Sequence, residues 1–228
     1  MLLDVRAVRE NLRNRDGQRV YYLRPGDQLT SAARDLLQQE RIPILPAAQA
    51  RPERYRLASG GYVDRKPEHM THLHGDVLVE KTHPRIRFRG SLDSFQALGN
   101  LVRLLCPETD QALGEILGLS NEILRADVLD QPLPEKPLLG MDQEALHRAS
   151  HFPQEEYGVP HFLPEPGDGR TVAFLNLLRA QIRQAELQGV TAFRDREGNP
   201  TREDILKALN RMSSGLYILM IMKKAGRL

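Results

Sequence analysis

The sequence predicts a mainly α protein, an up-and-down bundle of about five helices that carries a small N-terminal α+β appendage. Composition favours helices packed by aliphatic side chains, because Trp is absent and aromatic residues make up 5% of a chain rich in Leu and Ala. Several long stretches also repeat their apolar residues at a period near 3.6, which indicates amphipathic helices. At 228 residues, the chain suits one sizeable domain with a small addition.

Charge and cysteine content exclude several classes of protein. The formal net charge is +2, and basic residues are scattered among acidic ones, so nucleic acid is not a predicted partner. The N-terminus MLLDVRAVREN gains charge at once, unlike a signal peptide. Cys106 is the one cysteine and ends an apolar helical pattern, so we expect a buried free thiol. The sequence predicts a soluble, cytoplasmic protein without a membrane partner.

Residues 1–46 predict the α+β appendage. A short helix over 4–13 is followed by the turn signal Asp16-Gly17 and then by a strand over 19–23. Thr30 is the expected N-cap of a second helix that ends at about Arg41, because its hydroxyl can accept a first-turn N–H. A unit this small is marginal for folding alone.

Residues 47–76 predict a linker or long irregular loop, and 77–228 the helical domain. The linker ends in EHMTHLHGD, which carries His69, His72 and His74. No cysteine accompanies them and their spacing is not that of a helical metal motif, so we interpret them as polar loop residues and predict no metal ligands. A metal site remains the alternative interpretation of this stretch.

Basic side chains concentrate before a helix that is expected to begin at about Ser91. Lys81 and Arg85 are among them. Cations beside the free N–H groups of a helix N-terminus favour a phosphate, while a solvated basic loop fits these residues equally well. Asp93 lies off the apolar stripe of this helix, where it can pair with an arginine elsewhere.

The middle of the chain predicts helices over about 91–106, 108–129 and 142–151. Residues 151–169 predict an irregular loop, and loops of this length in a compact domain are usually functional. Phe162 lies there among prolines. It is either a plug for the core or a wall for a flat ligand.

The stretch GRTVAFLNLLRAQIRQAELQGV (169–190) predicts a long amphipathic helix. Beside its apolar stripe, Arg179, Arg183 and Glu186 fall on one line at i, i+4 and i+7. Two guanidinium groups on one helix face suit a polyphosphate, because each stays charged and forms bidentate bonds to oxygen pairs. Structural pairing with acids at a bundle interface is the alternative.

The last predicted helix is PTREDILKALNRMSSGLYILMIMKK (200–224). Thr201 is the expected start, with Asp204 at the capping-box position. Asn210 lies on this helix as a polar residue. The apolar run 216–222 is too short for a bilayer, which needs ~20 residues, so we expect it to be buried in the bundle or in a subunit interface.

Several of these pieces, in order, resemble ATP:corrinoid adenosyltransferases. The matching stretches are VEKTHPRIRFRGSLDSFQALG (79–99), FLPEPGDG (162–169), LNLLRAQIRQAE (175–186) and LNRMSSGLY (209–217). RADVLDQPL (125–133) and EALHRASH (144–151) are most similar to the ethanolamine-utilisation, EutT-type branch of that family.

The resemblance implies a fold, a reaction and an assembly. The expected fold is the adenosyltransferase helix bundle, assembled as a homotrimer with active sites between subunits. The expected reaction transfers the 5′-deoxyadenosyl group of ATP, with Mg²⁺, to reduced cob(I)alamin and releases triphosphate. Expected protein partners are a corrinoid reductase and an adenosylcobalamin-dependent ammonia-lyase, in the cytoplasm or associated with a microcompartment.

The resemblance also implies roles for individual residues of this chain. Asp93 is expected to pair across the interface with Arg179, Arg183 to hold the triphosphate, and Phe162 to lie under the corrin and displace its lower axial ligand. The expected ATP contacts are Lys81, Arg85, Arg183, Glu186 and Asn210.

Two departures from the family pattern bear on this. The related PduO-type enzymes begin with a TKTGD-like phosphate loop, which this chain lacks, and His74-Gly75-Asp76 is the nearest substitute. EutT-type enzymes carry a cysteine cluster before a THL stretch, which is residues 71–73 here, and no cysteine lies before it in this chain. The resemblance therefore predicts no iron or zinc site.

The sequence leaves two alternatives to an enzymatic function open. A protein of the same fold that binds cobalamin or ATP without catalysis, as a carrier or sensor, would explain the missing phosphate loop. An interaction scaffold is the second rival, and it predicts no stabilisation by ATP.

Overall fold

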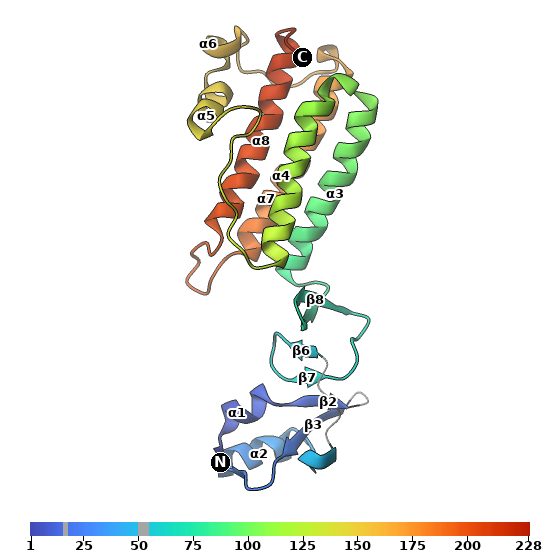
Figure 1. The fold of residues 1–228 in the computed structure, drawn as a ribbon, viewed down its shortest axis with the longest axis vertical. Helices are drawn as coiled ribbons and strands as arrows, with labels where there is room; N and C mark the ends of the chain where they lie inside the picture. The colour runs from blue at the N-terminus through green and yellow to red at the C-terminus, as the bar shows by residue number, and fades with distance from the viewer. Residues whose placement is uncertain (16–17, 50–54) are drawn as a thin grey trace. The chain divides into compact units, whose positions relative to one another are not determined.

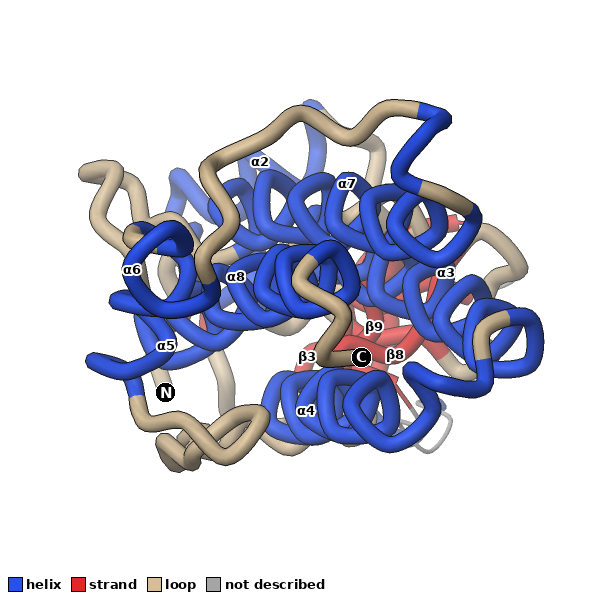
Figure 2. The backbone as a smooth tube through the Cα atoms, turned by 90° about the horizontal axis from the view of Figure 1, so that it is seen from above, coloured by secondary structure: helices blue, strands red, loops and turns tan. Residues whose placement is uncertain are grey.

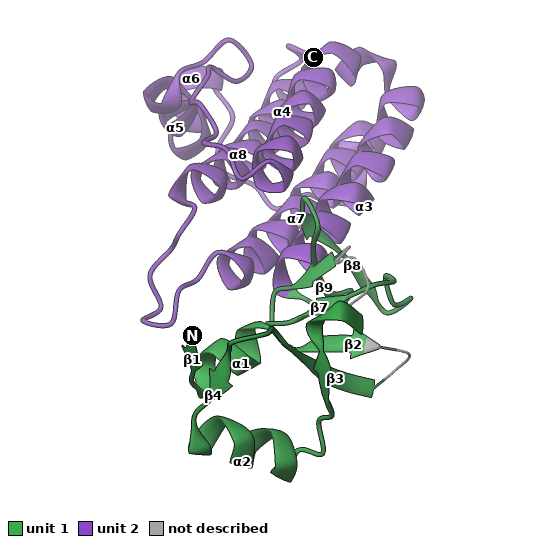
Figure 3. Cartoon of the chain, turned by 60° about the horizontal axis from the view of Figure 1, so that its bottom comes forward, with its two compact units in different colours: residues 1–83 green, residues 84–228 purple. Residues whose placement is uncertain are grey.

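A computed structural model describes residues 1–15, 18–49 and 55–228. Within these residues the chain forms two compact units, Met1–His83 and Pro84–Leu228, coloured separately in Figure 3. The first unit combines short strands with two helices, and the second is helical. Each unit buries its own hydrophobic clusters, as a domain that folds around its own core does.

Four long helices make the second unit among the described residues: α3 (Pro84–Leu105), α4 (Asp110–Val128), α7 (Arg170–Ala192) and α8 (Glu203–Lys224). Each packs against its neighbours in the ring α3–α4–α8–α7, and Figure 1 shows them side by side. The expected helical bundle is thus present, although its long helices number four where the sequence suggested about five.

Two short helices lie beside the long ones. α5 (Gln143–His151) begins after Asp142, whose carboxylate accepts the Ala145 N–H at 2.8 Å, and α6 (Pro153–Tyr157) follows. Both pack on α8, on the side that faces away from α3 (Figure 2). The segment 151–169, expected to be irregular, therefore contains a helix of its own, as well as the 3₁₀ turn η3 (Pro166–Asp168).

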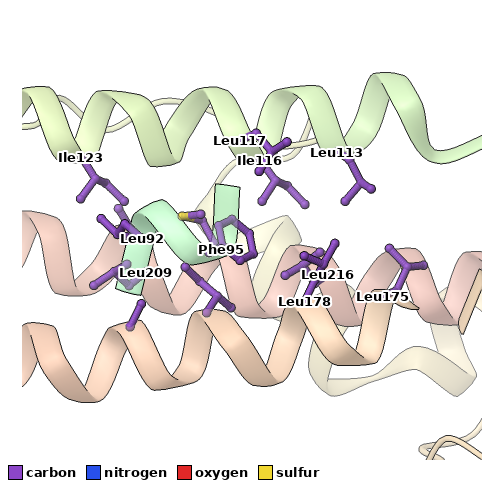
Figure 4. Close-up of a cluster of buried hydrophobic side chains, with 14 of the residues drawn as sticks. Leu92, Phe95, Leu113, Ile116, Leu117, Ile123, Leu175, Leu178, Leu209 and Leu216 are labelled. Carbon is purple, nitrogen blue, oxygen red and sulfur yellow. The ribbon is translucent and has the colours of Figure 1, made fainter. Parts of the chain in front are cut away.

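The apolar stripes point inward as the sequence predicts. Figure 4 shows side chains of α3, α4, α7 and α8 meeting in one cluster. Gly99 brings α3 close to α4, because a Cβ there would lie 2.5 Å from Leu117 Cδ2. Cys106 is fully buried, as expected, and the apolar run of α8 is buried within the chain itself, at Leu216, Ile218, Leu219, Met220 and Ile221.

Two predicted helix starts are wrong. α3 begins at Pro84, not near Ser91, because proline has the φ that a first helical turn needs and lacks only an N–H that would be unpaired there. α8 begins after Arg202, without a side-chain cap. Thr201 instead donates its hydroxyl to the Phe193 carbonyl at 3.1 Å, so the predicted capping box does not form.

The first unit contains a two-stranded sheet and, in its described residues, a seven-stranded one in the order β5-β3-β2-β7-β6-β9-β8. Helix α1 (Val5–Glu10) and helix α2 (Ser31–Gln39) accompany them. Thr30 caps α2 by accepting the Ala33 N–H at 3.2 Å, as predicted. The strands are β1 (Leu2–Leu3), β2 (Arg13–Arg15), β3 (Gln18–Leu23), β4 (Gln28–Leu29), β5 (Ile44–Pro46), β6 (Tyr55–Leu57), β7 (Tyr62–Val63), β8 (Met70–His74) and β9 (Val77–Glu80).

The segment 47–76 is not the irregular linker that the sequence suggested. It contributes the 3₁₀ turn η1 (Ala47–Gln49) and three strands. β6 and β7 have three and two residues, too few for a period of two to stand out. β8 has five, but its buried positions do not alternate. His72 and His74 accordingly lie on β8 rather than in a loop. The Asp16-Gly17 turn and residues 50–54 of this segment lie outside the described residues.

Candidate functional site

One face of α8 leaves the hydrophobic core and carries polar groups. Asn210, Ser214 and Tyr217 follow one another at i, i+4 and i+7, so they share that face. Asn210 is exposed and the other two are partly buried. The neighbouring positions Leu209 and Leu216 are fully buried, so the bundle core fixes the direction in which this polar face points.

Phe162 contacts this face of α8 through an aromatic stack with Tyr217 and a cation–π contact with Lys224. Its ring lies 6.1 Å from that of Tyr217, at an interplanar angle of 29°, and Lys224 Nζ lies 4.1 Å from the ring centroid. The same Nζ donates to Asp168 at 2.6 Å and lowers the pKa of that carboxyl, with help from the Glu165 N–H. The segment between α6 and α7 is thereby connected to α8 at Phe162 and at Asp168.

His161 adds a third connection, which no motif in the sequence predicted. Its Nε2 lies 3.0 Å from the His151 carbonyl oxygen and its Nδ1 3.0 Å from Tyr217 Oη. A carbonyl oxygen only accepts, so Nε2 carries the proton, and Nδ1 of the neutral ring accepts from the tyrosine hydroxyl. His161 thus joins the end of α5 to α8 immediately before Phe162.

Asn210 lines a cavity of about 290 Å³ between α5 and α8. Its lining also includes His147 and His151, which belong to the stretch EALHRASH, and Lys207 and Arg211. None of these four was predicted as a site residue. Two signals could have pointed to them: Arg211 follows Asn210 in the chain, and both histidines belong to a stretch that carries the family resemblance.

The arginine line of α7 is helical, as predicted. Arg179 is partly buried and donates from Nε and Nη2 to Asn176 Oδ1, at 3.3 and 3.2 Å. Arg183 is exposed and Glu186 partly buried. Asp93 is exposed on α3. The Asp93–Arg179 pair is expected between two subunits, so it can be tested only in the assembled oligomer and not in a single chain.

The two remaining predicted ATP contacts have protein partners. Lys81, in the first unit, donates to Glu68 at 3.1 Å and lowers the pKa of that carboxyl. Both side chains are exposed, so this pair contributes little. Arg85, in the second unit, donates to the buried Asp127 at 2.8 Å. Arg85 belongs to the first turn of α3, so of this pair only Lys81 lies in the segment before the helix.

Two negative findings, on metal sites and on membrane spans, apply to the residues that the structure describes. No three His, Cys, Asp or Glu side chains among them gather as a metal site. Of the histidines at 69, 72 and 74, His72 has its Nδ1 3.0 Å from the Gly75 carbonyl oxygen. No helix in this part of the chain has the length and apolar content that crossing a membrane requires.

Comparison with known proteins gives one family. The family model described as cobalamin adenosyltransferase matches residues 61–223. The chain is 40% identical over 164 residues to corrinoid adenosyltransferase EutT of Salmonella typhimurium (strain LT2), which covers 72% of this chain and 61% of that protein. It is also 40% identical over 161 residues to the protein of the same name in Escherichia coli (strain K12), covering 70% and 60%.

The chain therefore spans about three fifths of the length of these relatives. The matched family segment, in contrast, includes all four long helices and the polar face of α8. On this match, the chain belongs to the cobalamin adenosyltransferase family.

Proposed function

We propose that this protein is an ATP:cob(I)alamin adenosyltransferase, which attaches the 5′-deoxyadenosyl group of ATP to reduced cobalamin. The observation that carries the proposal is the polar face of α8. Asn210 and Tyr217 lie on this face, and Phe162 stacks on Tyr217, in a helix bundle of this family. An amide that can bind a nucleotide and an aromatic surface for a flat macrocycle are the two contacts that the reaction needs.

The reaction is a displacement at the 5′ carbon of ATP. A Co–C bond forms with the electron pair of Co(I), the C5′–O bond breaks, and triphosphate leaves with that bond's electrons. Charge therefore increases on the triphosphate, and we assign Arg183 to stabilise it, because a preorganised cation lowers the transition state most where charge develops. No general base is needed, since no proton is transferred.

We assign Phe162 to the lower face of the corrin. A phenyl ring offers the cobalt no donor atom, so its presence there favours loss of the lower axial ligand and hence reduction to Co(I). The ties from Tyr217, His161 and Lys224 support this role, because they restrict the ring's position. We assign Asn210 and Glu186 to ATP, with Lys81 as a further candidate. Arg85, whose Nε and Nη2 are bound to Asp127, is assigned a structural role.

Mg²⁺ would enter bound to the phosphates of ATP. Mg²⁺ retains several waters and is held in such sites by one or two carboxylates together with the phosphates. Glu186 fits this requirement, because it is a partly buried carboxylate one turn from Arg183 on the same helix. It would hold the ion, which supplies charge neutralisation for the triphosphate.

The test is an anaerobic assay with ATP, Mg²⁺ and chemically reduced cobalamin, followed by absorbance. Loss of Co(I) together with formation of adenosylcobalamin is the expected result. Absence of turnover while ATP or cobalamin still binds would replace the enzyme with a carrier or sensor of the same fold.

We further propose that the protein is a homotrimer that uses α3 and α7 as its interface. These adjacent helices expose a set of large apolar side chains, which is unusual for a surface that faces water. Leu104 is 81% exposed and Leu187 60%, and the set also includes Leu101, Leu105, Leu177 and Val190. The expected Asp93–Arg179 pair would join subunits in this region.

Leu104→Glu tests the assembly. A charge at the interface would be desolvated without a partner, so light scattering after size exclusion should show a smaller species than the unaltered protein. Leu163→Glu is the matched control, because Leu163 is 86% exposed but lies outside α3 and α7. A trimer that persists in Leu104→Glu, or an unaltered protein that is already monomeric, would contradict this interface.

The remaining proposals concern partners and location. We propose that a corrinoid reductase supplies the electron, that the product goes to an adenosylcobalamin-dependent ammonia-lyase, and that the protein acts in the cytoplasm, associated with a microcompartment. Reactivation of the cofactor-free lyase by this protein, cobalamin and ATP would test the transfer. A fluorescent fusion that stays diffuse in cells with microcompartments would exclude the last association.

A further inference from the structure

The cavity between α5 and α8 has a lining that the proposed reaction does not yet use. It holds about 290 Å³, enough for a phosphate group with its waters. α8 contributes Lys207, Asn210, Arg211 and Ser214, and α5 contributes His147 and His151. No carboxylate is among the residues that line it.

The polar side chains of this cavity offer N–H and O–H donors and no anion. The carboxylates that do approach its cations are peripheral. Lys207 Nζ lies 3.3 Å from Glu203, but both side chains are 64% exposed, and such a pair is weak enough for the lysine to exchange it for another anion. The chemistry of the lining therefore suits an oxyanion.

Arg211 is the buried cation of the site. Its side chain is 10% exposed, one Nη2–H donates to the Lys136 carbonyl, and Nη1 lies 4.0 Å from Glu135. Its Nε is buried and has no hydrogen-bond partner among the described residues. A buried N–H without a partner is unfavourable, so the fold leaves part of this guanidinium's hydrogen-bonding capacity unused.

The two histidines line the opposite wall. Their rings stack at 4.0 Å with an interplanar angle of 13°, on successive turns of α5. His151 Nδ1 lies 3.1 Å from the His147 carbonyl and 3.1 Å from Ser150 Oγ. This leaves Nε2 as the ring nitrogen of His151 for a ligand, and in the imidazolium form it is a donor.

We propose that this cavity binds a phosphate group of one of the two substrates, with Lys207 and Arg211 as its cations and the α5 histidines as the polar wall opposite them. The inference rests on the proposed function and adds α5 to the site. Two sources have the required chemistry: the polyphosphate of ATP, and the phosphodiester in the nucleotide loop of cobalamin. Asn210, already assigned to ATP, lines the same cavity.

The first experiment measures binding of inorganic tripolyphosphate to the full-length protein by calorimetry. Lys207→Met removes one donor from an exposed helix position, so the protein should stay folded, and the Kd should rise at least tenfold. His147→Asn should raise it severalfold. Arg148→Met is the matched control: it removes a charge from the same helix α5, but Arg148 is not among the cavity's lining residues, so the Kd should change less than twofold.

The second experiment identifies the source of the phosphate. If ATP supplies it, Lys207→Met weakens binding of ATP but not of adenosine. If cobalamin supplies it, the same change weakens binding of cobalamin but not of cobinamide, which lacks the phosphodiester. Either pattern supports the site. Unchanged binding of both substrates and of tripolyphosphate, with circular dichroism showing an intact fold, overturns it.

The experiments can refute the phosphate site and the transferase activity independently of each other. Full turnover with unchanged phosphate binding in Lys207→Met would remove the cavity and leave the transferase. Phosphate binding that depends on Lys207, in a protein that forms no adenosylcobalamin, would keep the site and remove the reaction.

Discussion

Two sites of largely buried arginines in the bundle differ in how completely their donors are paired. Where the last turn of α4 packs against the first turns of α3, the carboxylate of Asp127 is fully buried. Arg85 donates to its Oδ1 at 2.8 Å and to its backbone carbonyl at 2.7 Å, and Arg89 donates to Oδ2 at 2.5 Å. Both oxygens have a charged donor, so the desolvation of the carboxylate is compensated.

Beside the α5–α8 cavity, Arg211 is at least as buried but less completely paired. It has a backbone carbonyl and a distant carboxylate as partners, and its Nε has none among the described residues. A structural arginine is expected to have its donors satisfied within the fold. The contrast suggests that Asp127 and its arginines hold the bundle together, whereas Arg211 retains capacity for a ligand.

Asp127→Ala should have the largest effect on stability. It leaves two guanidinium groups partly buried without their carboxylate, and removing one partner of a buried ion pair costs about 3–5 kcal/mol. The measurement is the free energy of unfolding in urea. Asp110→Ala is the control, because the Asp110–Arg103 pair is exposed, and it should cost less than about 1 kcal/mol. Equal effects of the two changes would remove the distinction between buried and surface pairs.

Arg183→Ala should have the largest effect on catalysis and almost none on stability. Loss of a preorganised donor to a developing charge lowers kcat by about 10²–10³, and Arg183 is exposed on α7, so unfolding should change by less than about 0.5 kcal/mol. Steady-state kinetics and a urea titration check both. Arg170→Ala, also exposed on α7, should leave kcat/KM within twofold. A near-normal kcat/KM in Arg183→Ala would refute the assigned role.

Arg211→Met tests the other side of the comparison. It loses the bond to the Lys136 carbonyl but also removes the unpaired Nε, so it should cost about 1 kcal/mol of stability, well below Asp127→Ala. Binding of tripolyphosphate should weaken at least tenfold. A destabilisation as large as that of Asp127→Ala, with unchanged phosphate binding, would make Arg211 a structural residue like Arg85.

A smaller effect is expected at the other end of the bundle, in acid. Glu108 accepts from Thr171 Oγ1 at 2.6 Å and from Lys223 at 3.0 Å, and these bonds lower its pKa from 4.5 to about 2. The carboxylate therefore stabilises the fold above about pH 4.5, and this contribution disappears as the pH falls towards 2.

Glu108→Gln should remove that pH dependence. Its Tm should lie below that of the unaltered protein at pH 6, by about 2–4 °C at most because the side chain is partly exposed. The two Tm values should approach each other as the pH falls from 4.5 towards 2. Thermal melts at several pH values measure this. A constant Tm difference at every pH would show that the hydrogen bonds act without the charge.

Asp204 shows why the start of α8 was predicted wrongly from the sequence. In sequence it is the acid of a capping box, but in the structure burial, which raises its pKa, is outweighed by hydrogen bonds from Arg202, Leu133 and Ile205, and its pKa is lowered to about 2. The Leu133 N–H is 71 residues away. A partner so distant in the chain cannot be inferred from local capping rules.

The sequence by itself determined the helical bundle, its inward stripes, the α7 line of Arg179, Arg183 and Glu186, and the family resemblance. These depend on spacing within one helix, which the 3.6-residue period encodes locally. Tertiary structure alone decided which distant groups meet: Arg85 with Asp127, His161 with Tyr217, and the α5 histidines with Asn210 and Arg211 around one cavity. Such meetings depend on how helices pack, because burial penalises an unpaired polar group wherever in the chain its partner lies.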